Sequence, residues 1–246
     1  MLVAGGCRST APAIDPSMES FVPPGALVLA GVRLSQLRAS PLYSKLPPSL
    51  LAFAEPVREA SDLIIAYSRD GILLLARGSF RQTPAGATLV APNVAAAGSD
   101  AAVRAAAAQH RLGRTGAPAL LDRAEPLARD NPIWLIAQGG ATTLPLPGNW
   151  ENLNRVLHST DYVIAAAKVD SHIDLRASGI CRDAAAGREL EDTIRAMLSM
   201  ATAVARDPTT AALLRSIQLA IDGRSVTVSV SVSQAQSEQF LQQLAH

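Results

Sequence analysis

Short apolar segments separated by polar turns recur along most of the chain. Runs of about five apolar residues bounded by Gly, Pro or Asn are typical of β-strands. The clearest of these segments lie at 26–31, 63–66, 72–76, 133–137 and 226–232.

Helical spacing is clearest in one longer segment. Between residues 184 and 206 the apolar side chains fall three or four positions apart, so they share one face of a helix. Ser99 and Ser233 each stand where a hydroxyl can cap the first turn of a further helix. The shorter helices are predicted at 99–112, 118–129 and 234–244.

Two stretches of the chain, 61–81 and 160–182, resemble each other. Each starts with a hydroxyl residue and Asp, continues as an apolar run, turns through polar residues and ends Ala-x-Gly-x-x-Arg. An apolar run ending in Gly precedes each stretch, and a hairpin and a helix follow it. This repetition predicts an α+β fold of two tandem related β-α-ββ-(α)-ββ-α units, with mostly antiparallel sheets and helices packed on one face.

The repetition also sets the expected domain limits. The first unit spans 25–130 and the second spans 131–246, and we expect them to pack as one rigid body. Residues 1–24 are predicted to be a signal remnant followed by a flexible tether, since 8–24 is rich in Ser, Thr, Ala and Pro and shows no helical or strand period.

The two units differ in how their strands are patterned. In the first unit the strands at 63–66 and 72–76 are apolar at consecutive positions, which is typical of strands covered on both faces. In the second unit, apolar residues alternate with polar ones at 172–177 and 226–232. Because strand side chains point to alternate faces, one face of this sheet should be apolar and covered by the helix at 184–206. The other face should be polar and should meet water or a partner.

The N-terminus carries a possible lipid attachment site. The chain opens Met-Leu-Val-Ala-Gly-Gly-Cys, and small residues directly before Cys7 resemble the end of a bacterial lipoprotein signal. It departs from such signals because Ala4 stands where Leu is usual and because the charged start and long apolar stretch are not present. We expect Cys7 to be lipidated and the protein to be membrane-anchored on the periplasmic side or secreted; an ordinary flexible N-terminus is the alternative.

Composition disfavours several classes of partner. The formal net charge is +1, and the basic residues neither cluster nor interleave with aromatics as a phosphate-binding surface requires, so no nucleic acid is expected. No apolar run approaches the roughly 20 residues of a membrane-spanning helix, so the membrane is expected to be reached only through the N-terminal lipid. None of the four His residues has metal-ligand spacing to another ligand, and no phosphate-binding loop is present, so no metal or cofactor is predicted.

A few polar residues are candidates for a ligand or partner site. His172, Asp174 and Arg176 share one face of a predicted strand, where the imidazole and the carboxylate could form a hydrogen bond. Trp150 could close a groove at the start of a helix, and His158 follows shortly after it. A solvated strand face and ordinary core packing are the simpler interpretations of these residues. We predict Cys181 to be a buried structural thiol rather than a nucleophile.

The chain as a whole resembles exported bacterial proteins of unknown function, often lipoproteins, with duplicated Ala-rich α+β units. The resemblance rests on the segment around Cys7 and on 94–104 and 213–244. The resemblance transfers no catalytic residue. The N-terminal tether, the lack of a catalytic motif in the sequence and the polar sheet face of the second unit favour a non-enzymatic binding or structural role in the cell envelope, with a protein or a small ligand as partner. The alternative is a hydrolase with its site in the crevice between the two units. A third hypothesis is a structural protein that pairs through an exposed strand at 226–232; the oligomeric state stays open.

Overall fold

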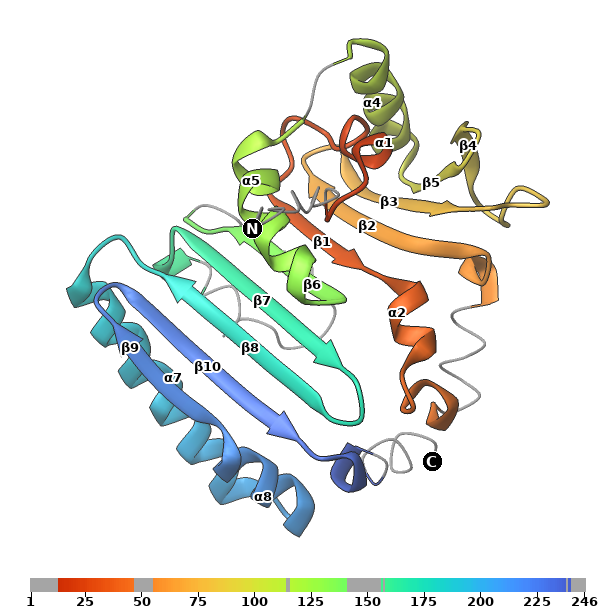
Figure 1. The fold of residues 1–246 in the computed structure, drawn as a ribbon. Coiled ribbons are helices and arrows are strands. Elements are labelled where there is room, and N and C mark those ends of the chain that lie inside the picture. Colours follow the sequence, from red (N-terminus) through yellow and green to blue (C-terminus); the bar gives the residue numbers. More distant parts are fainter. Residues whose placement is uncertain are drawn as a thin grey trace, which may run out of the picture.

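The strands of the protein form one antiparallel sheet in the computed structural model (Figure 1). The structure describes residues 13–46, 55–113, 116–140, 158–237, 156 and 239. The strands are β1 (Val28–Val32), β2 (Ala60–Ser68), β3 (Gly71–Gly78), β4 (Thr88–Ala91), β5 (Val94–Gly98), β6 (Ile133–Gln138), β7 (Tyr162–Val169), β8 (Ile173–Ile180), β9 (Gln218–Asp222) and β10 (Ser225–Val232). The helices are α1 (Pro16–Glu19), α2 (Leu34–Ala39), α4 (Asp100–Arg111), α5 (Pro118–Asp130), α7 (Ala184–Val204) and α8 (Pro208–Ser216), with 3-10 turns at Tyr43–Lys45 and Glu55–Val57.

The strand order is mirrored about the middle of the sheet. It runs β4-β5-β3-β2-β1 and then β6-β7-β8-β10-β9, so both halves follow the same order outward from the β1–β6 pair. β1 and β6 form a continuous ladder from Val28↔Ala137 to Val32↔Ile133. The fold is therefore α+β with two tandem related units, as the sequence predicts, and the two units share one sheet.

The repeated stretches 61–81 and 160–182 form equivalent hairpins, β2–β3 and β7–β8. In the first strand of each hairpin, however, the sequence alignment pairs residues that lie on opposite faces of the sheet. Leu63 packs beside Leu34 of α2 on one face of the sheet. Its aligned counterpart Tyr162 packs on the opposite face, where the Arg123 guanidinium lies 4.1 Å from the centre of its ring. Because side chains alternate along a strand, a shift of one residue moves each of them to the other face.

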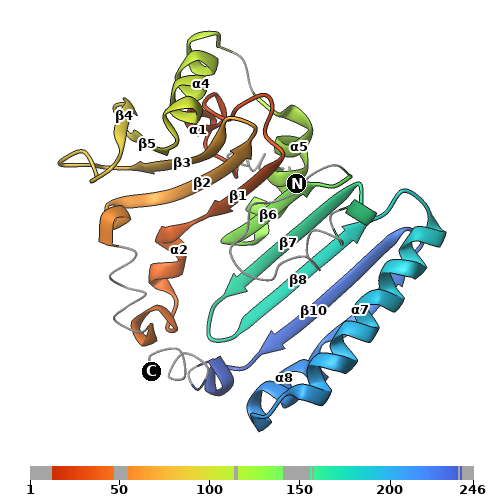
Figure 2. The ribbon, with the colours of Figure 1, turned by 180° about the vertical axis from the view of Figure 1, so that it is seen from behind.

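Helices lie on both faces of the full sheet. We call the face with Leu29, Ile64 and Ile136 the α5 face; α1, α4 and α5 pack on it. The opposite face is the α7 face, where α2 packs on the first half and α7 on the second. Figure 2 shows α7 and α8 alongside β10. In the second unit α7 covers the apolar face around Val226, as the alternation predicts.

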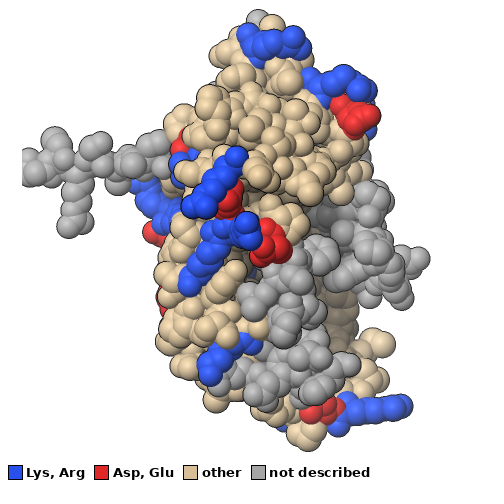
Figure 3. Space-filling model, turned by 90° about the vertical axis from the view of Figure 1, so that its right-hand side faces the viewer, with Lys and Arg blue, Asp and Glu red and all other residues tan. Residues whose placement is uncertain are grey.

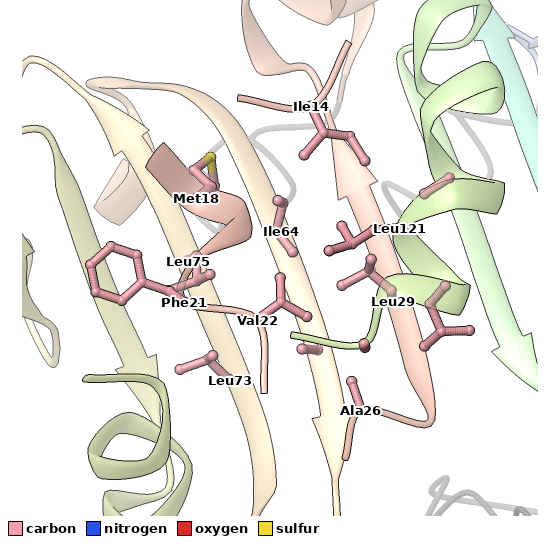
Figure 4. Close-up of a cluster of buried hydrophobic side chains, with 14 of the residues drawn as sticks. Ile14, Met18, Phe21, Val22, Ala26, Leu29, Ile64, Leu73, Leu75 and Leu121 are labelled. Carbon is pink, nitrogen blue, oxygen red and sulfur yellow. The ribbon is translucent and has the colours of Figure 1, made fainter. Parts of the chain in front are cut away.

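The main core lies on the α5 face of the first half. Leu29, Leu73 and Leu75 from the strands are fully buried there, and Leu121 of α5 packs among them (Figure 4). Ala102 and Ala106 of α4, both 0% exposed, bring that helix close to the sheet because a methyl group occupies little space. The small side chains therefore let the helices approach the sheet, and larger side chains such as Leu73 and Leu75 fill the space between them.

The N-terminal segment belongs to this core, so the prediction of a flexible tether is wrong for residues 13–24. Met18, Phe21 and Val22 are each at most 1% exposed and pack between the sheet and its helices (Figure 4). The Glu125 carboxylate of α5 accepts hydrogen bonds from the backbone N–H groups of Ala13 and Ile14, at 2.8 and 3.2 Å. These contacts tie the segment to the folded body.

The α7 face is less completely covered. Five large apolar side chains on this face are 38–53% exposed. They are Ile65, Ile72, Leu89, Leu175 and Ile221. For the first unit this differs from the prediction, since its consecutive apolar residues indicated strands covered on both faces. Among the described residues no helix is long and apolar enough to span a membrane.

The sheet edges are β4 and β9. β10 pairs with β8 along its whole length and with β9 from Ser225 to Ser229, so most of the strand at 226–232 lies inside the sheet. The hypothesis that this strand offers an exposed pairing edge is therefore wrong for 226–229.

Candidate functional site

A polar groove lies on the α5 face of the second half of the sheet. In Figure 1, α5 lies over β6, whereas β7, β8 and β10 have no described helix in front of them. The C-terminal end of α5 forms one wall of this groove through Leu127, Asp130 and Asn131. Its volume is about 820 Å³, within the range of small-molecule sites. The polar side chains that line its floor are Lys168, Asp174, Arg176, Ser178, Gln218, Ser229 and Ser231.

The alternation in β8 and β10 explains why this floor is polar. Neighbouring strands are in register, so Ser231 lies opposite Asp174, and Ser229 lies opposite Arg176. Residues directly opposite on antiparallel strands share a face, which places the hydroxyls and the charged groups in adjacent rows. The apolar residues between them face α7, so one strand serves both a packed face and an open polar face.

Asp174 is the most heavily engaged charged group of the floor. His172 Nε2 lies 2.9 Å from Asp174 Oδ2, which confirms that the imidazole and the carboxylate meet. A hydrogen bond from the Ser231 hydroxyl, with weaker contributions from His172 and the Lys168 ammonium, holds the pKa of Asp174 below its ordinary value of 3.8, although desolvation acts in the opposite direction. The carboxylate is therefore ionised at neutral pH, and it already interacts with His172 and Ser231.

Arg176 is differently placed. It occupies the middle of β8, between Ala166 of β7 and Ser229 of β10. Its side chain is exposed, and within the described part of the chain it makes no hydrogen bond or ion pair. Its five N–H donors are thus available to a ligand that enters the groove.

The structure brings some of the predicted site residues together and separates others. Asp174 and Arg176 line the groove, and His172 contacts Asp174 beside it. His158 precedes β7 and contacts the Gly140 carbonyl, so it lies at the end of β7 opposite to His172. Trp150 and Cys7 lie outside the described residues.

Sequence reasoning missed Lys168 and Asp130. Lys168 directly follows the apolar run of β7 and stands opposite Asp174 across the hairpin, so correct hairpin pairing would have found it. Asp130 enters the groove only because α5 crosses the sheet and ends there, and no local pattern signals that crossing.

Cys181 is buried, as predicted. Burial raises the pKa of its thiol, and the nearby carboxylates of Asp161 and Asp183 raise it further. These effects disfavour the thiolate that a nucleophile requires. Within the described ranges no group of three or more His, Cys, Asp and Glu side chains could hold a metal ion.

The charged side chains on the face seen in Figure 3 are mixed in sign. Lys and Arg lie next to Asp and Glu there, rather than gathering into a large patch of one sign. The described residues on this face therefore form no extended surface of one charge.

Comparison with known proteins shows similarity in fold. No family model and no curated protein matches the chain. The chain is similar to the structure of crystal form III of TP0453, with a TM-score of 0.56, 11% sequence identity, and 94% of this chain and 98% of that chain covered. For crystal form I of TP0453 the TM-score is 0.52 at 12% identity, with 95% and 99% covered. At this level of identity the likeness concerns the fold alone.

Proposed function

We propose that this protein is a non-enzymatic binding protein of the cell envelope, and that it holds a small polar ligand in the groove. The observation that carries the proposal is the convergence of Lys168, Arg176 and the serine hydroxyls on one open face of the sheet. A structural sheet face would gain more from apolar side chains under a helix, as in the first half of the molecule. A hydrophilic floor bounded by α5 instead favours a ligand that forms hydrogen bonds.

The engaged and unengaged groups have different roles in this proposal. Asp174 is held by Ser231 and His172, which stiffens the floor. Arg176 has donors free for the ligand, and a guanidinium recognises a carboxylate or phosphate group through two parallel hydrogen bonds. Recognition should therefore depend most on Arg176.

Retention of small molecules tests the binding role. The protein is incubated with a small-molecule extract of cell envelopes and freed of unbound material by gel filtration, and the retained molecules are identified by mass spectrometry. We expect at least one polar molecule to be retained by the wild type and lost in the double variant Lys168→Gln, Arg176→Gln. The matched control is Arg188→Gln on the exposed surface of α7, which should retain it. The same retained molecules in the wild type and the double variant would contradict the proposal.

We also propose that Cys7 carries a lipid that anchors the protein outside the cytoplasm. The support is the run of small residues before Cys7. Labelling of cells with a radioactive fatty acid should mark the wild type and the Cys181→Ser variant, because Cys181 is buried. The Cys7→Ser variant should be unlabelled. A wild-type protein that takes up no label would remove the anchor from the proposal and leave the groove unaffected.

One observation favours the alternative of a hydrolase. The His172–Asp174 hydrogen bond is the arrangement that orients an imidazole as a general base. The retention experiment separates the two roles: a molecule recovered unchanged supports binding. Fragments hydrolysed by the wild type but not by a His172→Ala variant would support the enzyme instead.

A further inference from the structure

Two opposite charges face the groove without partners of their own. Arg176 lies on the floor, and Asp130 lies in the wall formed by α5. Within the described part of the chain neither side chain makes an ion pair or a hydrogen bond, although both line the same cavity. The groove therefore presents one cationic and one anionic group that do not satisfy each other.

The neighbouring charges have other surroundings. Lys168 stands opposite Asp174 and helps to lower the pKa of this carboxylate, which also interacts with Ser231 and His172. Close to Asp130, Arg129 is paired with Glu125 at 3.1 Å, and the Arg33 guanidinium donates to the Ala128 carbonyl. Among the described residues, no Lys or Arg forms an ion pair with Asp130.

The position of Asp130 is electrostatically unfavourable for the free protein. It is the last residue of α5, where the partial negative charge of the helix end disfavours a carboxylate. A positively charged group bound there would relieve this repulsion. The same cavity offers a guanidinium to a negatively charged group, so a ligand with both charges would complement it.

We propose that the groove binds a zwitterion, namely a short peptide with free ends, with its carboxylate on Arg176 and its ammonium group on Asp130. The inference rests on the proposed function of the groove. A guanidinium and a carboxylate pair through two parallel hydrogen bonds, which gives this end of the ligand a defined orientation. The hydroxyl of Ser229 and the amide of Gln218 lie along the same floor and can bind the peptide groups. A cavity of about 820 Å³ has room for a few residues.

Calorimetric titration of the full chain with trialanine tests the assignment. Two blocked probes accompany it: N-acetyl-trialanine lacks the ammonium group, and trialanine amide lacks the carboxylate. We expect each blocked probe to bind at least ten-fold more weakly than trialanine. Arg176→Gln should weaken trialanine at least ten-fold but leave the binding of the amide unchanged. Asp130→Asn should weaken trialanine but leave the binding of the N-acetyl probe unchanged, and Arg188→Gln should change neither.

Other outcomes separate this inference from the proposed function. Equal binding of trialanine and both blocked probes would overturn the zwitterion. So would tighter, Arg176-dependent binding of phosphate, of a neutral sugar or of phosphoethanolamine, and the groove would then stand as a site for another ligand. If no probe binds and the retention experiment also finds no molecule lost in the groove variant, both proposals fail. Circular dichroism of each variant shows whether it is folded.

Discussion

The α5 face of the sheet is a buried core in the first half of the molecule and an open polar surface in the second. β3 and β8 hold equivalent places, each third from the middle of the sheet. On this face β3 carries Leu73 and Leu75, both 0% exposed, whereas β8 carries Asp174 and Arg176. The same strand arrangement thus stabilises the fold in one unit and leaves a surface for recognition in the other.

The helix that follows the last hairpin accounts for part of the difference. In the first unit α4 follows β5 and packs on β3 and β5 over the core. In the second unit, Gln239 after β10 donates a hydrogen bond to Thr209 of α8 at 3.0 Å. Among the described residues, none that follows β10 lines the polar face of β8 and β10.

The N-terminal segment that packs on the core of the first half gives the largest predicted effect on stability. Replacement of Phe21 by Ala should lower the free energy of unfolding by about 3–5 kcal/mol, because a fully buried aromatic ring would be lost. Urea denaturation followed by circular dichroism measures the change. A loss below about 1 kcal/mol would mean that the N-terminal segment is not part of the core.

A matched pair of strand variants tests the comparison directly. Leu73→Ala on β3 should cost about 2–5 kcal/mol of unfolding free energy, because it leaves a cavity in the core. Arg176→Ala on β8 should change it by less than about 0.5 kcal/mol, because the side chain is exposed and unpaired. A similar loss of unfolding free energy in the two variants would contradict the distinction between a covered first half and an open second half.

Gly31 marks the boundary between the two halves. A Cβ atom on Gly31 would lie 2.3 Å from the Trp134 ring, which occupies the space above the glycine. Gly31→Ala should therefore displace the ring and cost about 1–3 kcal/mol of unfolding free energy, with a shift in tryptophan fluorescence. Gly25→Ala is the control, since its Cβ would meet no atom within 4 Å. Equal stability of the two variants would show that the ring can move freely.

Asp174 gives the smallest predicted effect, and it depends on pH. Its pKa is lowered in the folded protein, chiefly by the Ser231 hydroxyl, so the ionised carboxylate stabilises the fold above the ordinary value of 3.8. This contribution is lost as the pH falls through the lower folded pKa. The stability difference between the wild type and Asp174→Asn should be below about 1 kcal/mol at pH 7 and should shrink towards pH 3. A difference that grows on acidification would contradict this assignment.

Local pattern predicted a large part of the fold. Strand periodicity located the hairpins, and the three- and four-residue spacing of apolar side chains, such as Leu190 and Ile194, located α7. Alternation in β8 also indicated the polar face that became the groove. These features succeed because they depend on residues close in sequence and on the period of a single element.

The rest depends on contacts between distant segments. Met18 and Phe21 lie in a stretch with no regular period, and only their packing against the sheet makes them core residues. The alignment of 61–66 with 160–165 matched residues of similar type that lie on opposite faces of the sheet. It could do so because similar apolar residues occur on both faces. Asp130 lines the same groove as Arg176 only because α5 crosses the sheet and ends there. The spacing of residues along the sequence cannot predict how a helix crosses a sheet.

The attachment of Ala13 and Ile14 to Glu125 limits how far the folded body can move from an acylated Cys7. Ala13 is the sixth residue after Cys7, and an extended chain covers at most about 3.6 Å per residue, so the reach is on the order of 20 Å. Glu125 and the groove residue Asp130 stand on the same helix, less than two turns apart. With the proposed anchor, the mouth of the groove would stay within a short distance of the bilayer surface, and ligands would be collected from that layer rather than from open solution.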